Sequence, residues 1–171
     1  DYDNDGCEDS SEDYDDDNDG VLDQFDSCQL GNLSWQSSNL TDYDSDGCKD
    51  ATEDIDDDND NVQDSYDTCP KGDLNWTSYS LSDNDGDGCR DSTEDANDDN
   101  DSFNDTADSC PAGFTNWTST STLDYDNDGC YDSTEDGDDD NDSIFDASDS
   151  CPRGVLSWLS NSTLDYDTDG C

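Results

Sequence analysis

The sequence repeats itself at a fixed step of 41 residues, without insertion or deletion. The step is kept by nine cysteines, four tryptophans and four glycines: Cys7, Cys48, Cys89, Cys130, Cys171, Cys28, Cys69, Cys110, Cys151, Trp35, Trp76, Trp117, Trp158, Gly31, Gly72, Gly113 and Gly154. A period of this length is typical of a tandem array whose units contact their neighbours. We therefore predict an extended array with repeats at residues 1–41, 42–82, 83–123 and 124–164, and we expect residues 165–171 to begin a fifth repeat of a longer array.

The charge of the chain restricts what it can bind. There are 52 Asp and Glu residues against 4 Lys and Arg, which gives a formal net charge of −48, and only 26% of the residues are hydrophobic. Such a composition alone favours disorder, because little apolar surface is buried to offset the loss of chain entropy. Nucleic acid is excluded as a direct partner, and no apolar run is long enough for membrane insertion. Metal cations are the natural partners.

Each repeat contains two acidic loops of twelve residues and a linker of thirteen. We call loops 1–12, 42–53, 83–94 and 124–135 the first-type loops, and loops 15–26, 56–67, 97–108 and 138–149 the second-type loops. Acids stand at loop positions 1, 3, 5, 9 and 12, and Gly stands at position 6 of every first-type loop. Of the 40 acid positions, 39 hold Asp or Glu, and the exception is Asn97. Calcium takes six to eight oxygen ligands in this order, with a backbone carbonyl from position 7.

We predict at least one Ca²⁺ in each complete loop and two in several. The ligands predicted from the first-type loops and the start of the fifth repeat are Asp1, Asp3, Asp5, Cys7, Asp9, Glu12, Asp42, Asp44, Asp46, Cys48, Asp50, Glu53, Asp83, Asp85, Asp87, Cys89, Asp91, Glu94, Asp124, Asp126, Asp128, Cys130, Asp132, Glu135, Asp165, Asp167 and Asp169. Those predicted from the second-type loops are Asp15, Asp17, Asp19, Val21, Asp23, Asp26, Asp56, Asp58, Asp60, Val62, Asp64, Asp67, Asn97, Asp99, Asp101, Phe103, Asp105, Asp108, Asp138, Asp140, Asp142, Ile144, Asp146 and Asp149.

The loops have the ligand spacing of EF-hands but not their surroundings. Only Asp13 and Tyr14 separate the first two loops, which leaves no room for flanking helices. Position 8, which is usually aliphatic in EF-hands, is Glu8 in the first loop and polar or aromatic in the others. We predict an irregular fold of turns and coil, stabilised by calcium and disulfides, with no helix longer than about three turns.

Several segments resemble thrombospondin type 3 repeats, which also occur in prokaryotic surface proteins. They are "DDDNDGVLDQFDSC" at 15–28, "DDDNDNVQDSYDTCP" at 56–70 and "DSCP" at 108–111 and 149–152. The resemblance implies a chain with little regular secondary structure that winds around calcium ions and is held by disulfides, often with more than one ion per loop. The tryptophan-bearing linker and the cysteine at position 7 of the first-type loops depart from the pattern of that family.

Two regular disulfide patterns fit the cysteine spacing. One joins two loops of a repeat, as in Cys7–Cys28, and the other closes the linker, as in Cys28–Cys48. The resemblance implies the second pattern, which comprises Cys28–Cys48, Cys69–Cys89, Cys110–Cys130 and Cys151–Cys171. Cysteines at this density and regularity indicate an oxidising environment, so we predict an extracellular or cell-surface location.

The linkers are poor in acid and rich in Ser and Thr, and each carries one Trp. We expect the Trp to pack as most of a small apolar core; the other reading of this residue is a platform for sugars. All five linker asparagines begin an Asn-x-Ser/Thr sequon, and we predict that they carry covalent glycans: Asn32, Asn39, Asn75, Asn116 and Asn161.

No catalytic constellation is visible in the sequence. The chain has no histidine, its only basic side chains are Lys49, Lys71, Arg90 and Arg153, and no nucleophile is paired with a base. We predict a structural protein that forms a rigid, glycosylated extracellular fibre, stalk or surface layer by self-association. The alternative is a calcium-dependent adhesin or other binding module, or a mineral-binding surface.

Overall fold

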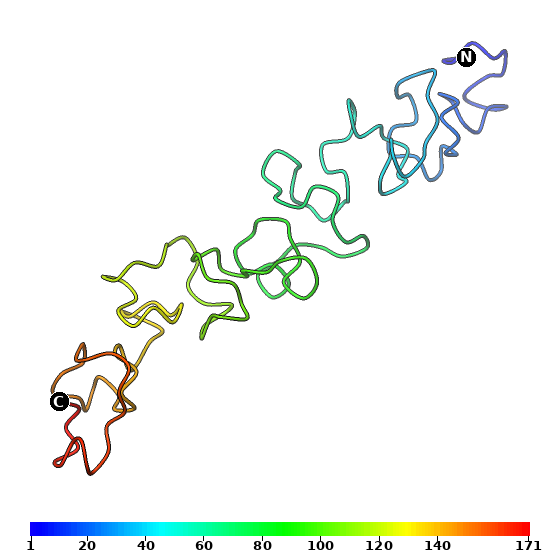
Figure 1. Cartoon of the computed structure of the whole chain (residues 1–171). Coiled ribbons are helices and arrows are strands. Elements are labelled where there is room, and N and C mark those ends of the chain that lie inside the picture. The colour runs from blue at the N-terminus through cyan, green and yellow to red at the C-terminus, as the bar shows by residue number, and fades with distance from the viewer. The chain divides into compact units, whose positions relative to one another are not determined.

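The computed structural model describes all 171 residues and contains neither α-helix nor β-strand (Figure 1). Turns, bends and coil make up the whole chain. This confirms the prediction of an irregular fold without long helices. None of the chain forms a helix that is long and apolar enough to cross a membrane.

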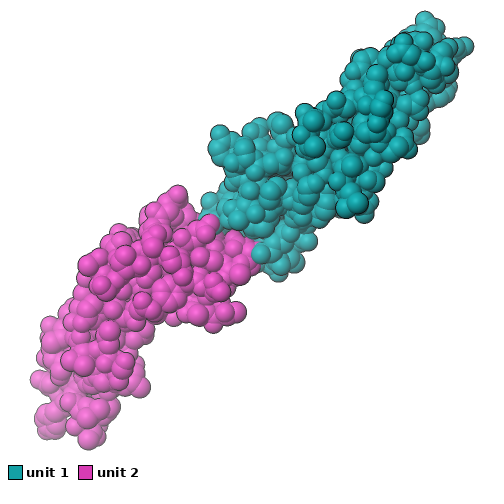
Figure 2. All heavy atoms as spheres, turned by 45° about the horizontal axis from the view of Figure 1, so that its top comes forward, with its two compact units in different colours: residues 1–94 teal, residues 95–171 magenta.

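The chain divides into two compact units, Asp1–Glu94 and Asp95–Cys171 (Figure 2). The first unit contains the disulfides Cys28–Cys48 and Cys69–Cys89, and the second contains Cys110–Cys130 and Cys151–Cys171. The division falls between the two acidic loops of the predicted third repeat. The repeat boundaries therefore stay a prediction from the sequence.

Two left-handed backbone positions shape every acidic loop. In loop 15–26 these are Asn18 at position 4, with φ of 60°, and Gly20 at position 6, with φ of 97°. Such conformations interrupt helix and strand, and they turn the carboxylates at positions 1, 3 and 5 toward one another. Asn tolerates this region because its short side chain bonds locally, whereas most residues pay about 1–2 kcal/mol there. Position 4 is left-handed throughout: Asn4, Asn18, Ser45, Asn59, Gly86, Asn100, Asn127, Asn141 and Thr168.

The loops are closed by their own carboxylates. Asp42, at position 1, accepts the N–H groups of Asp46 and Gly47 at 3.1 and 3.2 Å. Asp50, at position 9, accepts the N–H of Tyr43 at position 2, at 3.0 Å. These bonds satisfy backbone donors that a helix or sheet would otherwise pair.

Each second-type loop is tied to the first-type loop that follows it in the next repeat. The disulfide Cys28–Cys48 closes the linker between them, and the pattern Cys7–Cys28 does not occur. Of the nine cysteines, Cys7 is the one outside a disulfide. Each disulfide closes a segment with a sequence separation of 20. By restricting the unfolded chain, such a closure contributes about 3 kcal/mol.

Hydrogen bonds across the same junction reinforce the disulfide. Ser27 donates its N–H to the carbonyl of Asp46 at 2.7 Å. Ser37 donates its N–H to the carbonyl of Asp19 at 2.8 Å and its hydroxyl to Asp42 at 2.5 Å, so one linker serine joins both loops. Equivalent bonds join Thr68 to Asp87, Ser109 to Asp128, Ser150 to Asp169, Ser78 to Asp60 and Asp83, Ser119 to Asp101 and Asp124, and Ser160 to Asp142 and Asp165.

The buried side chains are carboxylates instead of apolar groups. The only buried hydrophobic residues are Cys48, Cys89 and Cys130. Sixteen Asp residues are buried, and every one of the largest fully buried side chains is an Asp. A chain with this interior cannot be stabilised mainly by the hydrophobic effect.

All four linker tryptophans are half-buried, and Trp35, Trp76 and Trp117 pack against position 8 of the next first-type loop. The ammonium of Lys49 lies 5.7 Å from the Trp35 ring centroid, and the centroids of Trp117 and Tyr131 are 5.0 Å apart. The guanidinium of Arg90 lies over Trp76 in the same way, at 5.8 Å. This contact explains why position 8 is a cation or an aromatic residue in the three first-type loops that follow a linker tryptophan, because either one attracts an indole ring.

Candidate metal centres

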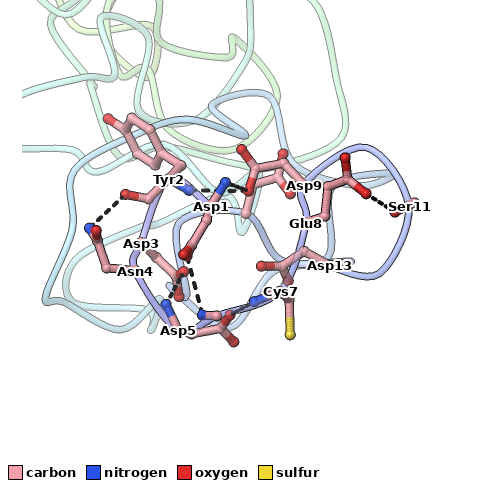
Figure 3. Close-up of polar contacts among 12 residues, drawn as sticks. Asp1, Tyr2, Asp3, Asn4, Asp5, Cys7, Glu8, Asp9, Ser11 and Asp13 are labelled. Atoms are coloured by element: carbon pink, nitrogen blue, oxygen red, sulfur yellow. Dashed lines mark hydrogen bonds and ion pairs between the residues drawn. The ribbon is translucent and has the colours of Figure 1, made fainter.

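The carboxylates at positions 1, 3 and 5 of the loops come together as the spacing predicts. In Asp42, Asp44 and Asp46 they offer oxygens that lie within 4.8 Å of one another, and the same is true of Asp15, Asp17 and Asp19. In loop 1–12, Asp1, Asp3 and Asp5 form such a group. Figure 3 shows this loop, in which Asp1 and Asp3 point toward one another. The Cys7 thiol forms a second such group with Asp5 and Asp13.

The aspartate between the two loops of a repeat faces the first-type loop. Burial raises the pKa of Asp44 to about 7, and the Asp46 and Asp54 carboxylates add to the shift. Burial also raises the pKa of Asp54 to about 6, with Asp46 contributing. In the fourth repeat, burial raises the pKa of Asp126 to about 7 with the Asp128 and Asp136 charges adding to the shift, and burial raises the pKa of Asp136 with the Asp128 charge adding to it. Asp54 and Asp136 are therefore further candidate ligands for the first-type loops.

The second-type loops hold their acids deeper. Asp17 and Asp19 are each 1% exposed. Burial raises the pKa of Asp17 to about 6, and the charge of Asp19 adds to this. Burial raises the pKa of Asp26, at position 12, to about 7, with contributions from Asp17, Asp19 and Asp46. Like charges thus meet in a space shielded from water.

One carboxylate oxygen at position 5 of each second-type loop is buried without a hydrogen-bond donor. Asp19 Oδ1 accepts the N–H of Val21 at 2.7 Å, while its Oδ2 has no partner. The same Oδ2 atom is unpartnered in Asp60, Asp101 and Asp142.

The acid at position 12 of each second-type loop also has one carboxylate oxygen that is buried without a hydrogen-bond donor. Asp26 Oδ1 accepts the N–H of Cys28 at 2.6 Å, and its Oδ2 is buried without a partner. In Asp67, Asp108 and Asp149, too, Oδ1 accepts the N–H of the cysteine two residues on, and Oδ2 is buried without a partner. A buried anion without a donor costs several kcal/mol unless a cation compensates it. Clustered carboxylate oxygens with free lone pairs fit a hard divalent cation such as calcium.

Position 9 of a first-type loop and position 2 of the following second-type loop form a separate pair, which we call the lateral pair. In the second repeat, Lys71 binds both members, Asp50 and Asp57, the latter at 3.3 Å. In the fourth, Arg153 binds Asp132 at 2.5 Å and Asp139 at 2.8 Å.

The first repeat has Leu30 where the second has Lys71. Its lateral pair, Asp9 and Asp16, instead forms an acidic group with Asp13, and the terminal amine of Asp1 lies 2.6 Å from Asp9. Position 9 thus belongs to the lateral pair and to the backbone bonds of its loop.

The glutamate at position 12 of the first-type loops reaches the preceding repeat. A Cβ on linker residue Gly31 would lie 2.8 Å from Asp17 Oδ2 and 2.9 Å from Glu53 Oε1. Glu94 lies against Gly72, and Glu135 lies with Asp99 against Gly113, in the same manner. This contact could not be predicted from the spacing of acids within one loop. The difference at position 12, which is Glu in first-type loops and Asp in second-type loops, is the sequence signal that could have indicated it.

Position 7 acts within its own loop, whereas the Tyr at position 2 acts across loops. The N–H at position 7 donates to the acid at position 5, as Cys48 does to Asp46 at 2.8 Å. The hydroxyl of Tyr43 donates to the carbonyl of Gly72 at 2.9 Å, and Tyr125 donates to Gly154 at 2.8 Å. The tyrosines therefore fix the linker glycines, a role that the sequence did not indicate.

Comparison with protein-family models and with curated proteins finds no match to this sequence. Its function is therefore inferred from the acidic clusters, the disulfides and the linkers of the chain itself.

Proposed function

We propose that this chain is a calcium-binding structural protein of the extracellular space or cell surface, in which bound ions take the place of an apolar core. The observation that carries the proposal is the set of buried oxygens without donors at positions 5 and 12 of all four second-type loops. Eight equivalent buried oxygens without donors do not fit a chain whose acidic residues simply face the solvent. They need a positive charge at the same place in every repeat.

The overall charge supports a high ion count. One divalent ion in each of the eight complete loops changes the net charge from −48 to −32, and two in each change it to −16. Without ions, mutual repulsion expands an acidic chain; with ions, the same carboxylates hold it together. Calcium suits these loops better than magnesium does, because it accepts irregular geometry and six to eight oxygens, whereas magnesium demands an octahedron.

The setting is supported by the disulfides and the linkers. Four disulfides are typical of an oxidising compartment. All five linker asparagines with sequons are exposed. Asn75 and Asn116 have left-handed backbones, with φ of 65° and 66°, and lie at bends of the chain. We assign glycans to these linkers and a fibre, stalk or surface layer to the assembled chain, in keeping with the resemblance to thrombospondin type 3 repeats.

An adhesive or catalytic role has less support. An adhesive face would recur with the repeat, but exposed Tyr14 and Phe25 are replaced by Ala96 and Ala107 two repeats later. The basic residues are engaged by carboxylates or aromatic rings.

The proposal is tested by adding and removing calcium. Circular dichroism and small-angle scattering of the oxidised chain are recorded in Ca²⁺, in EDTA and in Mg²⁺, and the bound ions are counted by native mass spectrometry. We expect eight or more Ca²⁺, a compact chain in Ca²⁺, expansion in EDTA and weak rescue by Mg²⁺. An unchanged scattering curve in EDTA would reject the calcium scaffold. Intact-mass measurement of the natural protein tests the glycans, and five unmodified linker asparagines would refute them.

A further inference from the structure

The second-type loop of one repeat and the first-type loop of the next meet around a linker glycine. Their contact includes the disulfide Cys28–Cys48 and the bonds of Ser37 to both loops. The Oδ2 atom of Asp17 accepts the N–H of Gly31 at 2.9 Å. Glu53 comes to the same glycine from the other side of the junction, so carboxylates of two repeats share one space.

The space is shielded from water and its oxygens are not all satisfied. Asp19 is 1% exposed and Asp26 is 7% exposed, and each has a buried Oδ2 without a donor. Glu53 Oε2 is also buried without a donor. The charges of Asp42 and Glu53 help to raise the pKa of Asp19, after burial and the Asp15 charge, so acids of the next repeat are close to it.

The glycine itself indicates that the space is reserved for ligands. A Cβ on Gly31 would collide with Asp17 and Glu53, and a Cβ on Gly113 would collide with Asp99 and Glu135, at 2.8–2.9 Å. On the opposite side, a Cβ on Gly47 would collide with Asp26. Two glycines thus let the acids of adjacent repeats approach one another.

We propose that a calcium ion at each such junction is shared between consecutive repeats, with Asp17, Asp19 and Asp26 as ligands from one repeat and Glu53 from the next. The equivalent junctions comprise Asp58, Asp60, Asp67 and Glu94, and Asp99, Asp101, Asp108 and Glu135. The inference rests on the proposed calcium binding and goes further, because it makes position 12 of a first-type loop a ligand for the repeat before it. Each shared ion is then a second cross-link beside the disulfide.

The test asks whether position 12 of a first-type loop binds an ion together with the preceding repeat. Glu53, Glu94 and Glu135 each follow a second-type loop. Bound Ca²⁺ is counted by native mass spectrometry and its affinity is measured by calorimetry, with Ca²⁺ as the only added metal. The variants are the triple substitution E53Q/E94Q/E135Q and, as the control, Glu8→Gln, an exposed glutamate that is not among the predicted ligands.

We expect the triple variant to lose three ions, or to bind three of them at least tenfold more weakly, and the Glu8→Gln variant to keep the full count. No loss in the triple variant, or an equal loss in Glu8→Gln, would overturn the proposal. Failure of the unsubstituted chain to bind Ca²⁺ would instead reject the proposed function.

A second pair of variants tests whether the ion is shared. Gly31→Ala puts a methyl group where the oxygens of Asp17 and Glu53 lie, so it should remove the same ion as Glu53→Gln. The double variant should therefore lose one ion, not two. A loss of two ions would show separate sites and contradict the shared ligand set. Intact disulfides, verified by mass, and an unchanged dichroism spectrum in Ca²⁺ exclude a folding defect.

Discussion

The first-type and second-type loops have the same acid pattern but different interiors. Asp17 and Asp19, at positions 3 and 5 of a second-type loop, are almost fully buried, whereas Asp44 and Asp46 at the same positions of a first-type loop are half-buried. Position 6 differs as well, since first-type loops always have Gly there. The acid pattern therefore determines which ligand oxygens a loop offers. Packing against the neighbouring loop determines how deeply each carboxylate is buried, and so how much its loss would destabilise the chain.

Position 6 shows the physical cause of this difference. At Gly47 the Asp26 carboxylate occupies the place of a Cβ, but at Gly20 the nearest atom to a Cβ is Gln36 Oε1, at 3.5 Å. A first-type loop that follows a second-type loop therefore needs Gly for space as well as for its left-handed backbone, whereas a Cβ on Gly6 would meet nothing within 4 Å. A second-type loop needs only the backbone, which Asn61, Ser102 and Ser143 also adopt.

The largest expected effect is a reversal of the pH dependence of stability by calcium. Asp26 and Asp67 have pKa values of about 7 in the folded chain without ions, against an ordinary value of 3.8. Between these limits the folded chain binds more protons than the unfolded chain, so its stability falls as pH rises. Bound calcium keeps the carboxylates ionised, so stability is lost instead as pH falls. Small-angle scattering from pH 4 to 8 in EDTA and thermal melting over the same range in Ca²⁺ measure this. A chain that does not expand in EDTA as pH rises, or that melts no earlier in Ca²⁺ as pH falls, would contradict it.

Substitution at position 5 should separate the two loop types within one repeat. In Ca²⁺ we expect Asp60→Asn to lower the free energy of unfolding by about 3 kcal/mol, because a buried cation loses its partner. Asp46→Asn should cost about 1 kcal/mol, because its carboxylate is partly hydrated. In EDTA, Asp60→Asn should reduce the expansion of the chain, because it removes a charge that no cation compensates. Calcium-dependent melting measures both variants, and equal costs would show that burial is not what distinguishes the loops.

Alanine at position 6 should give a smaller difference of the same kind. Gly47→Ala must bear left-handed strain and also displace Asp26, so we expect a loss of about 2–3 kcal/mol. Gly20→Ala bears only the strain, about 1 kcal/mol. Both glycines have φ near 90°, at 89° and 97°, which matches the pair for backbone conformation. Chemical denaturation in Ca²⁺ compares them, and a cost for Gly20→Ala as large as that for Gly47→Ala would exclude the role of Asp26.

The smallest expected effect is a gain in stability. Ser143 stands at position 6 of a second-type loop with φ of 81°. Ser143→Gly removes this strain and should raise the free energy of unfolding by about 1 kcal/mol, less the entropy that Gly adds to the unfolded chain. Ser45→Gly, at position 4 of a first-type loop with φ of 66°, provides the comparison. Melting temperatures in Ca²⁺ measure both, and a loss in Ser143→Gly would mean that its hydroxyl has a structural role.

Local features of this molecule could be predicted from the sequence. Gly at position 6 and the short separation between loops indicated turns without helices, and the resemblance implied the disulfides that the structure has. The grouping of acids at positions 1, 3 and 5 also followed from spacing alone. These features depend on residues that are close along the chain, and in such cases a pattern is informative.

Contacts between repeats could not be predicted in the same way. Neither the approach of Glu53 to Gly31 nor the bond from Tyr43 to Gly72 follows from a position within a loop. A period shows that neighbouring units are equivalent, but not which faces they turn to one another. In a chain without helices or strands, the path is set by individual turns, so these contacts emerge only from coordinates.

The disulfides also determine how the chain would carry a pulling force. Cys28 and Cys48 are 20 residues apart along the sequence, but their Cα atoms are only 5.1 Å apart. Tension passing from one cysteine to the other bypasses the linker, which would otherwise extend by about 70 Å. The load then runs through the acidic loops, while the linker with its sequons forms an unloaded side loop. Reduction would release this stored length, so the oxidation state sets how far each repeat can stretch before its loops unravel.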